Sequence, residues 1–284
     1  MWTRSIAVCD KLSVHAVEWS RRGLPCVLLH GLGDNASVWS HLAPRLMNRF
    51  RIVAVDLRGH GNSDWDPQAR YDAATFTADL AKAIAAFGFE RTILIGHSWG
   101  AETAIRFAAA NPAKVEALVI ADFGPELAQA GVDEVIKGFG EMPRSFASAD
   151  EYARWLTERR PLAEPRLLGQ FARYSLQPAA GGQCGIKTDA ALATQSEISQ
   201  LEPKNGRYYF SDLWDLMARI ECPSLVVRGA LSGVLPPDVA ARMVERALPA
   251  GRLETISMAG HAVMLDNPVA FARCIDAFLT RAAA

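Results

Sequence analysis

The chain has 284 residues, half of them hydrophobic, which is enough to bury the core of one α/β domain with an insertion. Its formal charge is −1, so no strong field attracts nucleic acid or an anionic membrane surface, and we expect a small-molecule partner. The 5 cysteines show no CxxC spacing, which argues against a disulfide framework and a zinc site and favours reduced thiols in a cytoplasm.

The N-terminal region predicts extended structure. Residues 1–19 lack the unbroken apolar run of a signal peptide. Residues 6–19, IAVCDKLSVHAVEW, are typical of an antiparallel pair of strands. No run in the chain approaches the roughly 18 apolar residues that a membrane span needs, so we expect no membrane span.

Short apolar runs then alternate with helical patterns. The runs PCVLLHG, FRIVAVD, RTILIGH, VEALVIAD, PSLVVRG and RLETISM are typical of strands buried on both faces of a sheet. Between them, Phe76, Leu80, Ile84 and Phe87 recur at the spacing of one helix face. The alternation predicts an α/β fold with a mostly parallel central sheet flanked by helices.

The alternation stops after Asp122 and resumes near Pro223. The residues between them are rich in Pro, Gly, Arg and aromatic side chains, and they contain a helical pattern at 150–160. We therefore predict an α/β core of residues 1–122 and 213–284, with residues 123–212 inserted as a mainly helical cap. Most aromatic side chains of the cap are expected to form its own core, and a few to line a pocket.

A serine stands between two glycines in GHSWG, residues 96–100, after a predicted strand and before a predicted helix. This pattern indicates a tight, strained turn that projects the hydroxyl of Ser98 above the sheet. Gly96 and Gly100 are needed because Cβ atoms would collide across so sharp a turn. The helix N-terminus favours a developing negative charge, so the segment suits a nucleophile; an ordinary helix N-cap is the structural alternative.

Four landmarks follow predicted strands in this order: HGLGD, DLRGHGNSD, GHSWG and AGHAVMLDNP. With them the chain resembles the α/β-hydrolase family over most of its length. The resemblance implies that Ser98 is the nucleophile and His261 the general base. It also implies an oxyanion hole formed by the backbone N–H groups of Leu32 and Trp99.

Several further residues adjoin these groups. His30 and Gly31 precede the oxyanion loop, whereas Phe123 and Trp155 belong to the predicted cap, and we expect these four to contact substrate. His97 adjoins the nucleophile but is expected to point away from it. Loop residues Arg58 and His60 are expected to shape a turn beneath the site.

The acid of the triad departs from the family pattern. Relatives carry it in a loop resembling RGALSDVL, whereas this chain reads RGALSGVL, with Gly233 at that position. We favour Asp122, because some family members carry the acid at the end of that strand and the order Ser, Asp, His is kept. The alternative role of Asp122 is a helix cap or a loop hydrogen bond. Asp238 is more typical of the start of a helix. A further alternative is that no carboxylate orients His261.

The resemblance implies a serine hydrolase, of the carboxylic ester hydrolase class, that cleaves a small ester, thioester or lactone through an acyl-enzyme. Serine at this position, where some relatives read GHDWG, favours acyl transfer over epoxide opening or dehalogenation. C–C bond hydrolysis and non-catalytic ligand binding on the same fold remain alternatives. No cofactor or metal is implied, because the histidines and carboxylates lack ligand spacing such as HExxH.

A competing interpretation comes from GLGDNA, residues 31–36. This segment fits G-x-G-x-x-A after a predicted strand, and Asp56 ends the next strand about 20 residues on, as a dinucleotide fingerprint requires. A nicotinamide-dependent oxidoreductase leaves GHSWG and AGHAVMLDNP unexplained. The hydrolase interpretation accounts for all of these segments and is favoured.

Overall fold

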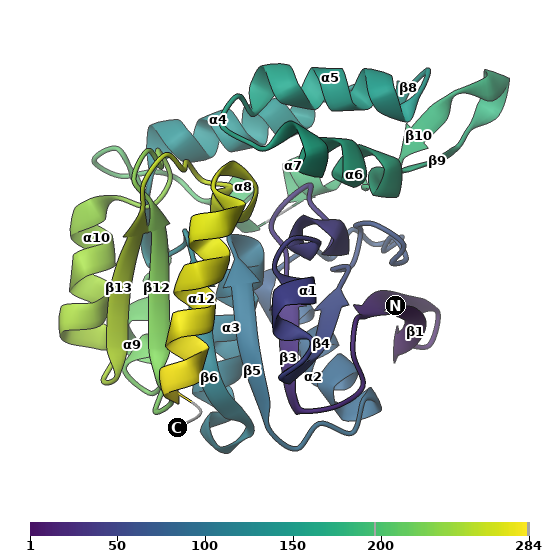
Figure 1. Ribbon diagram of the computed structural model, residues 1–284. Helices are drawn as coiled ribbons and strands as arrows, with labels where there is room; N and C mark the ends of the chain where they lie inside the picture. Colours follow the sequence, from purple (N-terminus) through teal and green to yellow (C-terminus); the bar gives the residue numbers. More distant parts are fainter. Residues whose placement is uncertain (196, 283–284) are drawn as a thin grey trace.

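An eight-stranded sheet forms the centre of the computed structural model, which describes residues 1–195 and 197–282 (Figure 1). The strand order is β1-β2-β4-β3-β5-β6-β12-β13. The strands are β1 (Trp2–Cys9), β2 (Leu12–Glu18), β3 (Leu24–Leu29), β4 (Phe50–Val55), β5 (Thr92–His97), β6 (Val115–Ala121), β12 (Ser224–Gly229) and β13 (Gly251–Ile256). β2 pairs antiparallel with β1 and β4, and the other neighbours are parallel. The predicted mostly parallel sheet is confirmed.

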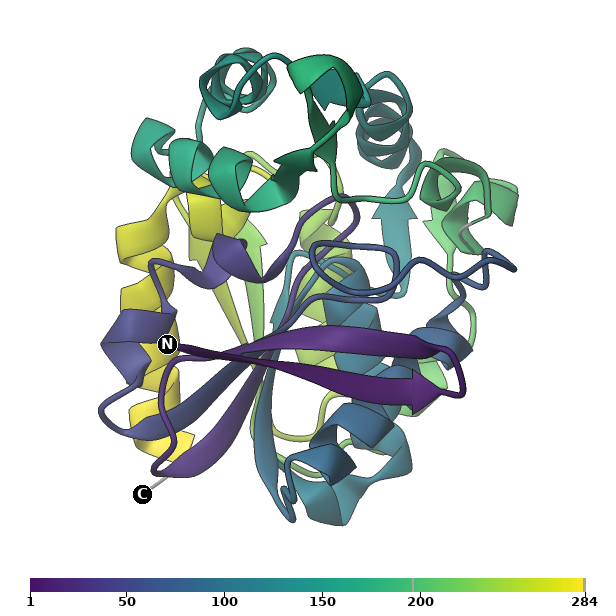
Figure 2. The same cartoon turned by 90° about the vertical axis from the view of Figure 1, so that its right-hand side faces the viewer.

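Helices cover both faces of this sheet. Figure 2 shows α1 (Ala43–Leu46) and α12 (Pro268–Ala282) on one face, with α2 (Ala73–Ala86) and α3 (Trp99–Ala110) on the other. The carboxylate of Asp72 caps α2 by accepting a hydrogen bond of 2.8 Å from Thr75 N. The apolar residues at helical spacing in α2 and α12 face the sheet and are buried, which ties each helix to the core.

The remaining helices of the core are short and lie in the C-terminal part of the chain. They are α9 (Leu213–Met217), α10 (Pro237–Arg242) and α11 (Val263–Asp266). Both α10 and α12 have proline at their first position, where the missing N–H costs no hydrogen bond. A π-helical turn, Met243–Ala247, extends α10.

The segment between β6 and α9 lies above the carboxyl ends of the strands (Figure 1). Its helices are α4 (Gln129–Gly140), α5 (Ala149–Arg159), α6 (Pro165–Ser175), α7 (Leu192–Gln195) and α8 (Glu197–Gln200). It also holds short strands: β8 (Ser145–Phe146), β10 (Cys184–Ile186) and β9 (Leu176–Pro178) form one small sheet, and β7 (Glu126–Ala128) pairs with β11 (Arg207–Tyr209). Strands of two or three residues leave no periodic signal in the sequence.

Polar contacts attach this segment to the core. Both terminal nitrogens of Arg160 lie 3.1 Å from Asp34 Oδ1, and Tyr174 Oη donates a hydrogen bond of 2.9 Å to Asp56 Oδ2. Asp34 and Asp56 follow β3 and β4, at the same edge of the sheet. The segment is therefore held above the loops where a site is expected in an open α/β sheet.

Candidate active site

Ser98 lies in a strained turn between β5 and α3. Its backbone has φ 51° and ψ −121°, which is unfavourable for a residue with a side chain. A Cβ on Gly96 would lie 2.3 Å from the carbonyl oxygen of Gly100, and a Cβ on Gly100 would lie 2.3 Å from that of Leu29. The second glycine thus makes room for the end of β3, rather than for the opposite side of the turn.

Asp122 follows β6 and directs its carboxylate at the imidazole of His261. Its Oδ2 lies 2.8 Å from His261 Nδ1 and accepts a second hydrogen bond, of 2.5 Å, from Ser232 Oγ. Its Oδ1 accepts a hydrogen bond of 3.1 Å from Gly229 N. The carboxylate is fully buried, and the backbone of Asp122 has a positive φ of 50°. The structure brings Asp122 and His261 together although position 233 is a glycine.

His97 fixes the backbone beside this imidazole. Its Nε2 lies 2.9 Å from the carbonyl oxygen of His261, and the two ring centroids are 4.7 Å apart. Burial lowers the pKa of His97 to about 3, so the ring is neutral and its Nε2–H donates to that carbonyl. His97 therefore holds the loop that carries His261.

Ser98 and His261 line one cavity with about 330 Å³ of empty space, part of it open to solvent. Its lining residues are Leu32, Ser98, Trp99, Phe123, Leu127, Val132, Val135, Ile136, Ile198, Val234 and His261. Within the described residues no hydrogen bond joins Ser98 Oγ to His261, which is common in serine hydrolase sites before substrate binds. The backbone N–H groups of Leu32 and Trp99 donate to no other described residue, so both are available to an oxyanion.

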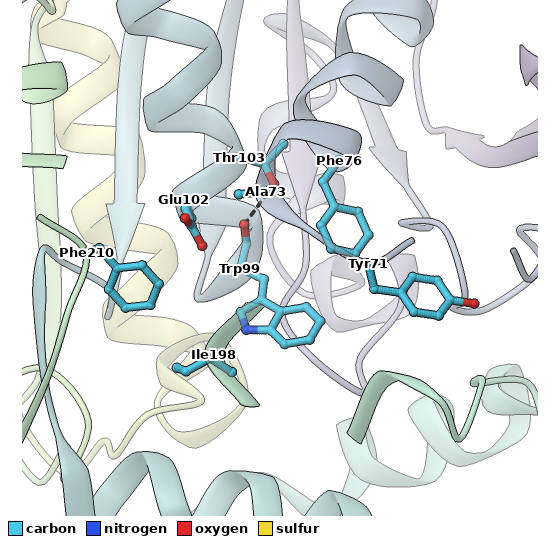
Figure 3. A pocket seen from close by; sticks show the side chains of 8 residues that line it. All are labelled: Tyr71, Ala73, Phe76, Trp99, Glu102, Thr103, Ile198 and Phe210. Carbon is cyan, nitrogen blue, oxygen red and sulfur yellow. Dashed lines mark hydrogen bonds between the residues drawn. The ribbon is translucent and has the colours of Figure 1, made fainter. Parts of the chain in front are cut away.

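A neighbouring cavity shares Trp99 and Ile198 with the first. It is lined by Tyr71, Ala73, Phe76, Trp99, Glu102, Thr103, Ile198 and Phe210. Figure 3 shows the indole of Trp99 among these side chains, with its ring centroid 5.9 Å from that of Phe76. Glu102 Oε1 lies 2.8 Å from a terminal nitrogen of Arg106. Trp99 thus forms a wall common to both cavities.

The family model of the alpha/beta hydrolase fold matches residues 25–268 of this chain. The matched range contains the strained serine turn, both candidate oxyanion donors and the Asp122–His261 pair. The chain belongs to the α/β-hydrolase family.

Curated members of the α/β-hydrolase family resemble the chain along most of its length. A 2-(acetamidomethylene)succinate hydrolase of Mesorhizobium japonicum is 28% identical over 253 residues, covering 89% of this chain and 87% of the relative. A pimeloyl-[acyl-carrier protein] methyl ester esterase of Aeromonas hydrophila is 27% identical over 269 residues, covering 93% of this chain and 98% of the relative.

Solved structures of α/β-hydrolases superpose equally widely. The crystal structure of E-2-(acetamidomethylene)succinate hydrolase has a TM-score of 0.86 at 26% identity and covers 98% of this chain and 99% of its own. An α/β hydrolase from Novosphingobium aromaticivorans has a TM-score of 0.83 at 29% identity and covers 99% of this chain and 98% of its own. The relatives named here are hydrolases, so hydrolysis is the activity class that the family supports.

His30 and Trp155, which were expected to contact substrate, are not among the described residues that line the cavity, and neither is Gly31. His30 is fully buried, with Nδ1 2.8 Å from Gly31 O and Nε2 accepting a hydrogen bond of 2.9 Å from Leu57 N. Trp155 packs within the cap, and its ring centroid lies 6.0 Å from that of Tyr152. Both side chains therefore make internal contacts and do not face the cavity.

The other two lie close to Ser98. Phe123 follows Asp122 directly and lines the cavity. A Cβ on Gly31 would lie 2.8 Å from the Cβ of Ser98, so the chain passes the serine closely at that point. Of the expected contacts, the structure therefore brings Gly31 and Phe123 to the α/β-hydrolase site.

The loop after β4 has a structural role in this α/β-hydrolase. Arg58 binds Asp79 at 2.8 Å and Asp66 at 2.5 Å, with all three side chains nearly inaccessible. His60 Nε2 accepts a hydrogen bond of 3.1 Å from Gly33 N, and burial lowers the pKa of His60 to about 3. A neutral His60 thereby supports the loop that carries Leu32.

The residues that suggested a dinucleotide site are occupied by internal contacts. Asp56 Oδ1 accepts a hydrogen bond of 2.7 Å from Ala36 N, and Oδ2 accepts one of 3.0 Å from Asn62 N. Residues 36–39 form a short 3-10 turn rather than the long helix that a pyrophosphate needs. In the part of the chain that the structure describes, no helix is both long and apolar enough to cross a membrane, and no three His, Cys, Asp or Glu side chains are grouped to hold a metal ion.

Sequence reasoning missed Ser232 and the wall supplied by α4. Ser232 directly precedes Gly233, and a hydroxyl beside the position usually taken by the acid was the available signal. Val132, Val135 and Ile136 recur at the spacing of one helix face, but a sequence does not show whether such a face meets a core or a cavity.

Proposed function

We propose that this α/β-hydrolase is a serine hydrolase of small carboxylic esters, with thioesters and lactones as related substrates. The observation that carries the proposal is the contact of 2.8 Å between His261 Nδ1 and the buried carboxylate of Asp122, beside the cavity that Ser98 also lines. An imidazole with one nitrogen fixed by a carboxylate presents the other as a base. Relatives named as an esterase and as a hydrolase are consistent with this chemistry.

The proposed reaction starts with attack of Ser98 Oγ on the carbonyl carbon of the ester. His261 Nε2 takes the hydroxyl proton and Asp122 stabilises the imidazolium that results. The backbone N–H groups of Leu32 and Trp99 stabilise the negative charge on the carbonyl oxygen. His261 then returns the proton to the departing alcohol, and water hydrolyses the acyl-enzyme by the same steps.

Asp122 is proposed as the acid in place of a residue at position 233. It receives hydrogen bonds from Ser232 Oγ and Gly229 N, and both stabilise the ionised carboxylate. The strand that precedes it, β6, pairs with β5, which carries Ser98. The acid and the nucleophile are therefore positioned by neighbouring strands of one sheet. A binding protein without catalysis has no need for this buried pair.

We propose the cytoplasm as the location, because free cysteines persist in a reducing compartment. The substrate is proposed to be a small molecule, as in the family. Among the described residues that line this cavity, none is an arginine or lysine that could bind a carboxylate.

Two substitutions test the proposal. Ser98→Ala removes the nucleophile and is expected to lower kcat for p-nitrophenyl acetate by about 10⁵-fold or more. Asp122→Asn leaves His261 poorly oriented and is expected to lower kcat by about 10⁴-fold.

Asp238→Asn is the matched control for the second substitution. The carboxylate of Asp238 is half exposed and binds Arg207 at the surface, so kcat is expected to stay at the wild-type value. Wild-type turnover by Asp122→Asn would remove Asp122 from the mechanism. Failure of a fluorophosphonate to label Ser98 in the wild-type protein would refute the whole proposal.

A further inference from the structure

The walls of the Ser98 cavity come from two parts of the chain. The core supplies Ser98 and His261 with the loop residues near them. The segment above the sheet supplies Val132, Val135 and Ile136 from one face of α4, and adds Leu127 and Ile198. The branched side chains of α4 thus form an apolar part of the wall of the cavity that Ser98 and His261 also line.

Charge is excluded from this lining. Among the described residues that line the cavity there is no Asp, Glu, Lys or Arg. The charged residues of α4, Asp133, Glu134 and Lys137, are exposed on its other faces.

The arginines of the surrounding region are already paired. Arg160 gives both terminal nitrogens to Asp34 Oδ1. Arg242 binds Glu126 through both terminal nitrogens, and Arg207 binds it through one. A negatively charged group inside the cavity would find no arginine or lysine among the lining residues that the structure describes.

We propose that this cavity is an acyl-binding site selective for uncharged, apolar acyl groups, and that α4 sets their length. The inference rests on the proposed ester hydrolysis at Ser98. A carboxylate at the far end of the acyl chain loses its hydration in such a cavity without gaining a partner, whereas a methyl group gains apolar contact. The site therefore discriminates by charge as well as by size.

A matched substrate pair tests the selection by charge. p-Nitrophenyl hexanoate and the mono-p-nitrophenyl ester of adipic acid have acyl groups with the same number of carbons, but one ends in methyl and the other in carboxylate. The wild-type protein is expected to show a kcat/KM about 100-fold higher for the hexanoate. Equal values, or a preference for the adipate, would overturn the inference.

A chain-length series tests the selection by size. From acetate to hexanoate, kcat/KM is expected to rise about fourfold for each methylene buried against α4, until the cavity is full. A flat series would contradict an apolar acyl site. Both measurements use the wild-type protein and so do not depend on a variant that folds.

Ile136→Arg tests the role of α4 directly. An arginine at this half-buried position offers a cation to the distal carboxylate, so the hexanoate-to-adipate ratio is expected to fall at least tenfold. Ala130→Arg adds the same charge at an exposed position of α4 that does not line the cavity, and the ratio is expected to keep its wild-type value. An equal change in both variants would mean that net charge, not the cavity wall, sets the preference.

Labelling separates this inference from the proposed function. A protein that is labelled at Ser98 and hydrolyses p-nitrophenyl acetate, yet prefers the adipate, refutes the acyl selectivity alone. A protein with neither labelling nor turnover refutes both. Labelling, turnover and the hexanoate preference together support both.

Discussion

The ion pair between Asp34 and Arg160 joins the core to the segment above it, and its removal should loosen that attachment. Asp34 lies two residues after Leu32, and Arg160 follows α5. The two hydrogen bonds from Arg160 to Asp34, each of 3.1 Å, connect residues 126 positions apart. We consider the single variants Asp34→Asn and Arg160→Met and the variant that combines them.

The magnitude follows from burial. The side chain of Asp34 is 3% exposed and that of Arg160 is 28% exposed, so Arg160→Met leaves a buried carboxylate, and Asp34→Asn a partly buried guanidinium, without its partner. Breaking a buried pair in this way costs about 3 kcal/mol. Each kcal/mol lowers Tm by about 2–4 °C in a chain of roughly this size, so each single variant is expected to lose about 6–12 °C. The double variant contains neither charge, so it is expected to be about 2 kcal/mol more stable than the sum of the two single-variant losses predicts.

The pH dependence gives a second readout. Burial alone would raise the pKa of Asp34, but Arg160, through its charge and hydrogen bonds, and the neighbouring His97 and His30 together outweigh burial and hold the pKa below its ordinary value. A lowered folded-state pKa stabilises the protein above the unfolded value near 4, and this stabilisation is lost as pH falls through the folded-state value. The difference between wild type and Arg160→Met is expected to shrink in acid.

Thermal unfolding and urea unfolding at pH 7.5 provide the assay, with all four proteins compared at one scan rate. The reasoning is refuted if the two single effects add within about 0.5 kcal/mol in the double variant, because additivity indicates that the side chains act independently. Values of KM for a p-nitrophenyl ester are expected to rise in the single variants, since the loop of Leu32 loses its support.

Ser232→Ala removes a hydrogen bond to the carboxylate of Asp122 and is expected to lower kcat about tenfold with little change in KM. Ser232→Thr keeps the hydroxyl and is expected to keep most of the activity. An unchanged kcat and pH profile in Ser232→Ala would show that Asp122 does not need this hydrogen bond. Burial of neutral His60 and His97 lowers the pKa of each to about 3, so protonation favours the unfolded chain. The free energy of unfolding, measured in urea, is expected to fall by about 2 kcal/mol per histidine between pH 6.5 and pH 5. In His60→Gln the part of this fall that comes from His60 should be absent. An unfolding free energy that does not change over this pH range in the wild type would contradict the burial argument.

The sheet and the serine turn could be predicted because their signals are local. Buried parallel strands require apolar runs, and the strained turn at Ser98 requires glycines at fixed offsets. Asp122 was a candidate because strand ends meet at one edge of the sheet. The contact of Asp122 with His261 depends on two loops 139 residues apart and on backbone strain at Asp122, neither of which has a sequence signature.

The failures have a common physical origin. His30 lies next to the loop of Leu32 and Trp155 lies in the predicted cap, but hydrogen bonds of the buried His30 and ring packing of Trp155 decide their orientation. The sequence predicted that His97 points away from Ser98 but not which group it binds. The fold shows that it binds the carbonyl oxygen of His261. The length and charge of a cavity likewise arise from packing between distant segments.

The division of the cavity between core and α4 has an evolutionary consequence. Ser98, Asp122 and His261 stand on loops at the edge of the sheet, whereas Val132, Val135 and Ile136 stand on a helix inserted between strands. A point mutation in the codons for α4 reshapes the wall and leaves the three polar groups in place. Mutations in α4 can therefore change which ligand the cavity accepts during evolution, without altering the three polar residues at the edge of the sheet.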